Sequence, residues 1–366
     1  MRVSLRSRLD RRGERREARD ERPSGCPSSI AALLFIVLAS CPSASLPAQN
    51  SAATDADTQQ ALARAEASIK AGKNDDAIQI LKPLTLQKAE ARGVEALLGK
   101  AFYQDKDFEG AIPHLELAVK QAPGDAESAQ LLGLSYSLLG RSSEAIAFLE
   151  KVQGSVPHPD PSGFYVLGVN YLQSRQFDKA RVAFARMFSV SPASAQAYLV
   201  LGQMMMHQNL EDQAGPELKQ AVALDPRIPM AHFLLGEAYL FRSRVQDAID
   251  EFKAELECNP ISWLAYWRLG DSYSRLERWD DAERALKQAI WLDQTFTGPY
   301  LLLGKVELKK GDAALASGFL ERTIKMDPNN FSAHYLLGTA YQQMGRSQDA
   351  EREFETSRRL HPEKGG

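Results

Sequence analysis

Apolar positions along this chain recur with a helical period, and the whole pattern returns about every 34 residues. Between residues 92 and 362, apolar side chains spaced four apart alternate with stretches rich in charge. A spacing of four places side chains on one face of an α-helix, so each stretch predicts an amphipathic helix. The period predicts a repeat architecture instead of a single globular core. The marker of the period is the dipeptide Leu-Gly, at Leu98-Gly99, Leu132-Gly133, Leu167-Gly168, Leu201-Gly202, Leu235-Gly236, Leu269-Gly270, Leu303-Gly304 and Leu337-Gly338.

Other positions keep the same register, counted here from the glycine of each Leu-Gly pair (the repeat glycine). An aromatic residue follows it by three in most copies, an alanine by twelve, and a large apolar residue by sixteen. After Gly236 these are Tyr239, Ala248 and Phe252, and Pro260 closes the copy. Proline disfavours helix in the residue before it and has no amide donor, so it ends the second helix. Each copy therefore predicts two helices, with small residues where they cross.

This pattern resembles the tetratricopeptide repeat over roughly residues 58–362. The resemblance implies an all-α fold, an α-solenoid in which about nine helix-turn-helix units coil into a right-handed superhelix. Residues 58–91 are interpreted as a degenerate first unit, because Arg64-Ala65 replaces Leu-Gly there. Eight units are expected within 92–362, starting near residues 92, 126, 161, 195, 229, 263, 297 and 331, and residues 363–366 are a tail.

Departures from the repeat predict local changes. Gly140, Gly311 and Gly345 are expected to form left-handed turns between paired helices. The dipeptide Gly215-Pro216 falls just inside a second helix, which it is expected to kink or delay. Glu307 stands where most copies have an aromatic residue.

The N-terminal segment reads as an export signal. Residues 1–22 carry nine Arg against five acids, and an uncharged apolar run follows from Ile30 to Ala39. Ten residues are too few to cross a membrane, which takes about 20 in a helix, whereas a basic segment before a short apolar run is typical of a secretory signal. The segment 42–57 is small and polar, and is predicted to be a flexible linker.

Two cleavage sites remain open for this signal. Leu38-Ala39-Ser40-Cys41 resembles the bacterial lipobox, in which Cys41 would be acylated after removal of the preceding residues; this assigns 1–41 to the signal. Small residues before Gln49 would instead suit ordinary signal peptidase and assign 1–48. We favour the lipobox because Cys41 directly follows the apolar run. The expected location is periplasmic, as a lipoprotein held to the membrane through its lipid alone; the alternative is a soluble periplasmic or secreted protein.

Composition and motifs argue against catalysis. No HExxH, GxSxG or glycine-rich phosphate loop occurs. His232 and His334 fall at equivalent repeat positions, which favours a packing role. The three cysteines have no CxxC spacing, so no metal site or cofactor is expected. Since the net charge is −3 despite the arginine-rich start, the body is acidic, and nucleic acid is not expected as a partner.

The resemblance implies a concave groove, lined by the first helices, that binds a peptide or protein segment. Residues three before each repeat glycine form an apolar and aromatic series (the ladder), although each could instead be helix-packing core. Aromatic residues in clefts are common binding anchors. The ladder consists of Tyr165, Leu199, Phe233, Trp267, Leu301 and Tyr335. Polar groove positions, one or five after the repeat glycine, are Gln203, Glu237, Asp271, Arg275, Lys305 and Lys309.

All four tryptophans lie between Trp263 and Trp291, and they form either a binding hot spot or local core with one exposed ring. Together these features predict a non-enzymatic protein-interaction scaffold of the cell envelope. The alternative is an adaptor subunit that brings a separate transferase or peptidase to its substrate. The oligomeric state does not follow from the sequence.

Overall fold

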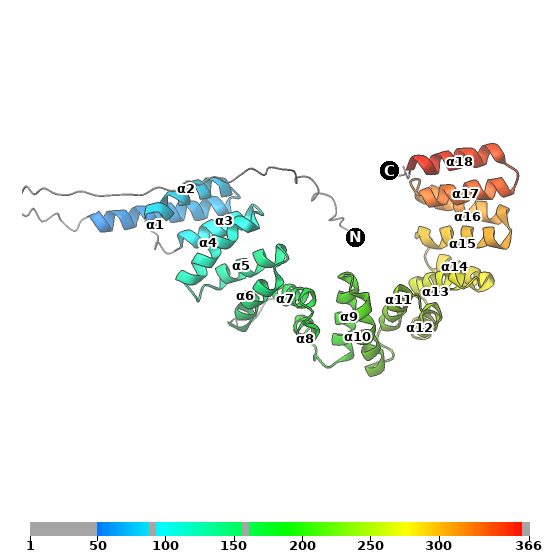
Figure 1. Cartoon of the computed structure of the whole chain (residues 1–366), viewed down its shortest axis with the longest axis horizontal. Coiled ribbons are helices and arrows are strands. Elements are labelled where there is room, and N and C mark those ends of the chain that lie inside the picture. The colour runs from blue at the N-terminus through cyan, green and yellow to red at the C-terminus, as the bar shows by residue number, and fades with distance from the viewer. Residues whose placement is uncertain (1–49, 88–92, 156–160, 361–366) are drawn as a thin grey trace, which may run out of the picture. The chain divides into compact units, whose positions relative to one another are not determined.

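The computed structural model describes residues 50–87, 93–155 and 161–360. In these residues all regular structure is helical, with 18 helices and no strand, and the helices follow one another in pairs (Figure 1). The predicted all-α solenoid is confirmed. The helices are α1 (Asn50–Lys70), α2 (Asn74–Gln87), α3 (Val94–Gln104), α4 (Phe108–Gln121), α5 (Ala126–Leu138), α6 (Ser142–Ser155), α7 (Pro161–Gln173), α8 (Phe177–Met187), α9 (Ala195–His207), α10 (Glu211–Leu224), α11 (Ala231–Phe241), α12 (Val245–Cys258), α13 (Trp263–Arg275), α14 (Trp279–Leu292), α15 (Thr297–Lys310), α16 (Ala313–Met326), α17 (Phe331–Gln343) and α18 (Ser347–Leu360).

Helix α1 begins earlier than the sequence predicted. It starts at Asn50, so residues 50–57, assigned above to the linker, are helical. Alanine-rich sequence extends an existing helix readily, because each added residue contributes a hydrogen bond without a new nucleation cost. The remaining linker residues, the signal segment with Cys41, and the tail 363–366 lie outside the described residues.

Each repeat glycine lies against the large apolar residue sixteen positions later. A Cβ atom at Gly236 would lie 2.5 Å from the Phe252 ring, and one at Gly270 would lie 2.5 Å from Leu286. Real Cβ contacts are essentially never below 3.0 Å. The alanine twelve positions on, such as Ala248, is fully buried at the same crossing. The same contact joins Gly99 to Leu115, Gly133 to Leu149, Gly168 to Phe184, Gly202 to Leu218, Gly304 to Leu320 and Gly338 to Phe354.

In every complete repeat, one residue of the turn between the paired helices has the left-handed backbone conformation. Gly140, Gly311 and Gly345 have φ of 73°, 86° and 75°, which confirms their predicted role. Two backbone hydrogen bonds close the turn, for example from the Asp312 N–H to the Glu307 carbonyl. Because these bonds recur, other repeats hold a non-glycine residue in the same conformation, at a cost of about 1–2 kcal/mol. Those residues are Lys106, Arg175, Asn209, Ser243 and Glu277.

Pro216 does not delay its helix. Helix α10 begins at Glu211, in the same register as the second helices of neighbouring repeats, so the predicted delay is wrong. Proline removes the amide that would donate to the Asp212 carbonyl. The Arg242 guanidinium, just after α11, donates to this carbonyl at 2.6 Å and to the Asp212 carboxylate at 2.9 Å. A side chain of the next repeat thus replaces the missing donor.

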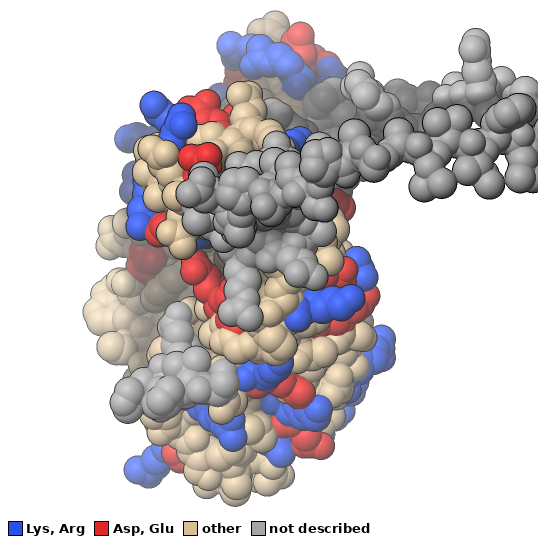
Figure 2. All heavy atoms as spheres, turned by 90° about the vertical axis from the view of Figure 1, so that its left-hand side faces the viewer, with Lys and Arg blue, Asp and Glu red and all other residues tan. Residues whose placement is uncertain are grey.

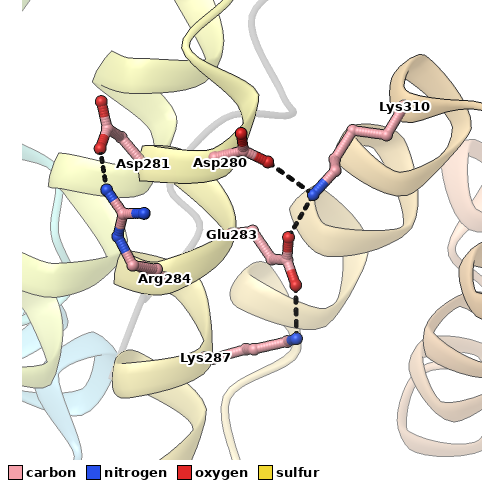
Figure 3. Close-up of polar contacts among 6 residues, drawn as sticks. All are labelled: Asp280, Asp281, Glu283, Arg284, Lys287 and Lys310. Atoms are coloured by element: carbon pink, nitrogen blue, oxygen red, sulfur yellow. Dashed lines mark hydrogen bonds and ion pairs between the residues drawn. The ribbon is translucent and has the colours of Figure 1, made fainter.

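Ion pairs replace an aromatic contact where α14 meets α15. Elsewhere a repeat tyrosine donates to a glutamate of the preceding second helix, as Tyr341 does to Glu321 at 2.9 Å. Here Glu307 takes the tyrosine's place and is buried, which raises its pKa, and the nearby Glu283 raises it further. Lys310 bridges from α15 to α14 by binding Glu283 at 2.5 Å and Asp280 at 2.8 Å. Figure 3 shows this cluster, which comprises Asp280, Asp281, Glu283, Arg284, Lys287 and Lys310.

The buried apolar residues form an extended core along the helix pairs. The largest cluster runs from Ala111 to Val306, and smaller clusters lie at Ala65–Ala101 and Ala316–Ala350. Each repeat therefore buries its apolar face partly against its neighbours, as expected when stacked units share one core.

Candidate functional site

The ladder residues differ in exposure. Tyr165 and Tyr335 are 42% and 58% exposed, whereas Leu199 and Phe233 are only 9% and 7% exposed. The Phe233 ring lies 5.8 Å from that of Phe252, on the second helix of its own repeat. The interpretation of Leu199 and Phe233 as groove anchors is therefore corrected. They belong to the helix-packing core, the alternative that the sequence left open.

Trp267 is also largely engaged within the chain. Its ring lies 4.9 Å from that of Phe296, and the Arg268 guanidinium lies over it at 4.2 Å from the ring centroid. Its indole nitrogen is buried and has no hydrogen-bond partner among the described residues. The Trp263 ring lies 4.9 Å from the same phenylalanine ring, inclined at 52°. Three of the four tryptophans are partly buried, while Trp291 is 71% exposed. Local packing with one exposed ring thus describes this cluster.

The predicted acidic groove residues have basic partners. Arg268 binds Glu237 at 2.6 Å and joins α13 to α11, while Arg275 pairs with Asp271 at 3.0 Å. Burial raises the pKa of Glu237, and Arg268 opposes this shift. Sequence reasoning missed Arg268, because it lies two positions before its repeat glycine. The other predicted polar positions are exposed, namely Gln203, Lys305 and Lys309.

Three predicted residues meet in one cavity. Leu301 and Lys305 of α15 and Tyr335 of α17 line a volume of about 890 Å³, which we call the C-terminal cavity. The structure therefore brings together the last two ladder positions and one predicted cation. The remaining lining residues are Leu302, Phe331, Ser332, Leu336, Thr339, Gln342, Phe354, Ser357 and Arg358.

The lining is apolar and cationic. Phe331 and Tyr335 are 42% and 58% exposed, and the tyrosine ring lies 5.6 Å from that of Phe354. Lys305 and Arg358 line the cavity, and no acidic residue does. By contrast, acidic and basic side chains are interspersed over the face shown in Figure 2. A cleft with exposed aromatic rings and cations can take an apolar side chain together with a carboxylate.

Sequence reasoning found three of the twelve lining residues, because it considered only a few positions on first helices around the repeat glycine. Phe354 and Arg358 come from the second helix α18. Phe331 lies four residues before Tyr335 and opens the same helix. An aromatic pair spaced by four on a first helix was a signal available in the sequence.

A second cavity of about 400 Å³ lies between α6, α7 and α8. Several of its polar groups are engaged with one another, whereas Gln153 Oε1 is buried without a hydrogen-bond partner among the described residues. The Tyr171 hydroxyl donates to Glu150, which also pairs with Lys179 at 3.2 Å. Burial and this carboxylate raise the pKa of Tyr171. The pair of Glu150 and Lys179 joins α6 to α8.

Comparison with protein families identifies the repeat. Three family models, each described as tetratricopeptide repeat, match this chain. The first matches residues 62–126, 97–159, 165–218 and 212–262, the second residues 265–330, and the third residues 319–352. The chain belongs to the tetratricopeptide repeat family. The search of curated proteins gave no match.

Several solved structures are similar to parts of this tetratricopeptide repeat array. The crystal structure of MamA is 25% identical, covers 46% of this chain and 93% of MamA, and has a TM-score of 0.43. YrrB, a TPR protein with an unusual peptide-binding site, is 20% identical over 47% of this chain and 89% of YrrB, with a TM-score of 0.43. The APC/C hetero-tetramer Cut9-Hcn1 is 21% identical over 76% of this chain and 55% of that chain, with a TM-score of 0.42. These scores are low, so the fold assignment rests on the helices and the family match.

Neither a membrane span nor a metal site occurs in the described part of the tetratricopeptide repeat chain. None of its described helices combines the length and hydrophobicity needed to cross a bilayer. Among the same residues, no group of three or more His, Cys, Asp or Glu could hold a metal ion.

Two histidines join paired helices to the preceding loop. The Nδ1 atom of His232 lies 2.6 Å from the Glu251 carboxylate, and its Nε2 atom lies 3.1 Å from the Pro226 carbonyl. His334 repeats this geometry with Glu353 and Pro328, at 2.6 and 3.1 Å. A carboxylate and a carbonyl both accept, so the two contacts of His232 suit a protonated ring that donates from both nitrogens. These contacts support the packing role expected from the repeat.

The stability of the array should depend on pH through His232. The hydrogen bond with Glu251 raises the pKa of His232, and burial opposes it. Because the folded state holds the proton of His232 more tightly than the unfolded chain does, protonation of His232 stabilises the fold. This stabilisation is complete below the ordinary pKa of 6.5 and is lost as pH rises through the pKa of the folded state. We expect His232→Gln to lower the free energy of unfolding more at about pH 6 than at about pH 9.

Urea denaturation followed by circular dichroism measures this difference. His207→Gln is the matched control, because His207 is exposed at the end of α9. The control should change stability equally at both pH values. An equal loss for His232→Gln at both values would contradict the proposed protonated ring.

Proposed function

We propose that this protein is a non-catalytic interaction scaffold that binds a segment of a partner protein along its first helices. The observation that carries the proposal is the C-terminal cavity, where apolar and aromatic side chains of α15 and α17 lie beside Lys305 and Arg358. Membership of the tetratricopeptide repeat family supports a scaffold role.

The cavity has the properties of a protein-binding site and lacks an arrangement for chemistry. Its lining contains no histidine, cysteine or carboxylate that could transfer a proton or attack a substrate. Its volume of about 890 Å³ would hold one or two large side chains of a bound segment. Lys305 has an exposed ammonium group that can pair with a carboxylate of that segment.

We further propose that the scaffold works in the cell envelope. The arginine-rich segment before Ile30–Ala39 supports export, and Cys41, two residues after the end of this run, supports attachment of lipid. The polar residues that follow Cys41 would leave the helical array in the aqueous phase beside the membrane. The support for this step comes from the sequence alone.

Photo-crosslinking in native envelopes tests the scaffold role. We expect p-benzoylphenylalanine at Thr339 or Gln342, which line the cavity, to form a discrete adduct with one partner. The matched control is Arg322, exposed on the second helix α16, which should give no such adduct. A partner that is itself an enzyme would indicate the adaptor role. Equal yields at all three positions, or none at Thr339 and Gln342, would contradict the proposal.

Metabolic labelling with a fatty acid tests the anchor. We expect label in the wild-type protein and its loss in Cys41→Ala, because the acyl chain is attached at that thiol. Cys258→Ala is the control and should keep the label, since Cys258 lies at the end of α12 within the array. Equal labelling of wild type and Cys41→Ala would remove the lipoprotein proposal.

A further inference from the structure

In four repeats, an arginine lies over the aromatic residue that follows the repeat glycine by three. Arg346, five residues after Tyr341, lies 4.1 Å from the centroid of its ring. A residue of the preceding second helix, twenty positions before the tyrosine, either accepts from its hydroxyl, as Glu321 does, or lies over the ring. A neutral ring thus fills these junctions between repeats. The same arginine contact joins Arg141 to Tyr136, Arg244 to Tyr239 and Arg278 to Tyr273, each at 4.5 Å, and Lys219 lies over Tyr239 at 5.4 Å.

The repeat formed by α15 and α16 departs from this arrangement at both positions. Glu307 replaces the aromatic residue, and Asp312 replaces the arginine five residues later. Glu307 is only 2% exposed, and its Oε1 atom is buried without a hydrogen-bond partner among the described residues. A carboxylate in such a place has lost hydration without a compensating contact, so burial favours the protonated carboxyl group.

The lysines close to Glu307 are already bound to other carboxylates (Figure 3). Lys310 binds Glu283 and Asp280, at 2.5 and 2.8 Å. Lys287 binds Glu283 at 2.5 Å. If Glu307 were ionised, three carboxylates of α14 and α15 would share these two cations, and repulsion from Glu283 would add to the cost of burial. The charged groups that act on Glu307 are Glu283 and Lys287 of α14, Lys310 of α15 and Asp312, the N-cap residue of α16.

These surroundings raise the pKa of Glu307. Burial is the largest cause and Glu283 adds to it, whereas Lys310 and Lys287 oppose it. Because the folded state holds this proton more tightly than the unfolded chain does, protonation of Glu307 stabilises the fold. The stabilisation is complete below the ordinary pKa of 4.5 and is lost as pH rises through the pKa of the folded state.

We propose that the junction between α14 and α15 is a pH-sensitive joint of the array, tightest while Glu307 carries a proton and looser once the proton is lost. Loss of the proton leaves a buried charge, which is relieved when α15 moves away from α14 and water reaches the carboxylate. Because each repeat of a solenoid contacts only its neighbours, one junction can open while the others stay closed. This inference does not depend on the proposed function.

Hydrogen exchange of the full-length protein, measured by mass spectrometry, tests the joint. Protection factors correct for the pH dependence of the intrinsic exchange rate and report opening helix by helix. Glu307→Gln keeps the shape of the protonated side chain and cannot ionise. It should raise the protection of α15 several-fold at about pH 7 and change it little at about pH 4.5, where the wild-type protein already holds the proton.

Two further variants make the result specific. Glu307→Tyr restores the residue type of other repeats, with Lys287 placed as Lys219 is beside Tyr239. This variant also removes the titrating group, so it should raise the protection of α15 more at about pH 7 than at about pH 4.5. Glu257→Gln is the matched control, because Glu257 is exposed on α12, and it should leave the protection of α15 unchanged at both pH values.

Two results would overturn the proposal. One is a change in α15 protection that is equal at both pH values in either Glu307 variant, because the carboxyl group would then act without titrating. The other is a pH-dependent gain that is as large in α5 as in α15, because the effect would then belong to the whole array and not to one joint.

Discussion

The contact between each repeat glycine and the side chain sixteen residues later sets the geometry of the whole array. Where Gly236 lies against Phe252, or Gly270 against Leu286, there is no space for even one additional carbon atom. The large side chain of the second helix therefore packs directly on the backbone of the first, and a buried alanine lies twelve positions after the repeat glycine. Repeated eight times, this contact fixes which side chains of a first helix face the neighbouring repeat and which face solvent.

The positions of the candidate site residues follow from the register that this contact sets. The same register position is buried at Phe233, whose ring packs near Phe252, and exposed at Tyr335, whose ring lies near Phe354. Residues outside the repeat pattern then adjust individual junctions. Arg242 supplies a donor that Pro216 lacks, and Lys310 joins α15 to α14 where Glu307 has replaced an aromatic residue. Binding specificity can therefore vary along the array while the scaffold remains the same.

The sequence predicted the scaffold well, because its determinants are local and repeated. Helix pairing, the close approach at the glycines, and the left-handed turns at Gly140, Gly311 and Gly345 follow from one or two residues each. The candidate site was predicted only in part. Whether Leu301 lines a cavity depends on residues of α17 in the next repeat, and the contribution of Phe354 and Arg358 requires knowing that α18 reaches the cavity. The helical start of α1 was missed because polar, small residues fit a linker and a helix end equally well.

A double-mutant cycle at Gly270 and Leu286 tests the central contact most directly, with urea denaturation as the measurement. In the wild-type background, Gly270→Ala should lower the free energy of unfolding by more than about 1 kcal/mol, because the new methyl group overlaps Leu286. In a Leu286→Ala background the overlap is gone, and Gly270→Ala should be neutral or stabilise by up to about 1 kcal/mol through its higher helix propensity. The same loss in both backgrounds would show that the glycine is required for another reason, and would contradict this account.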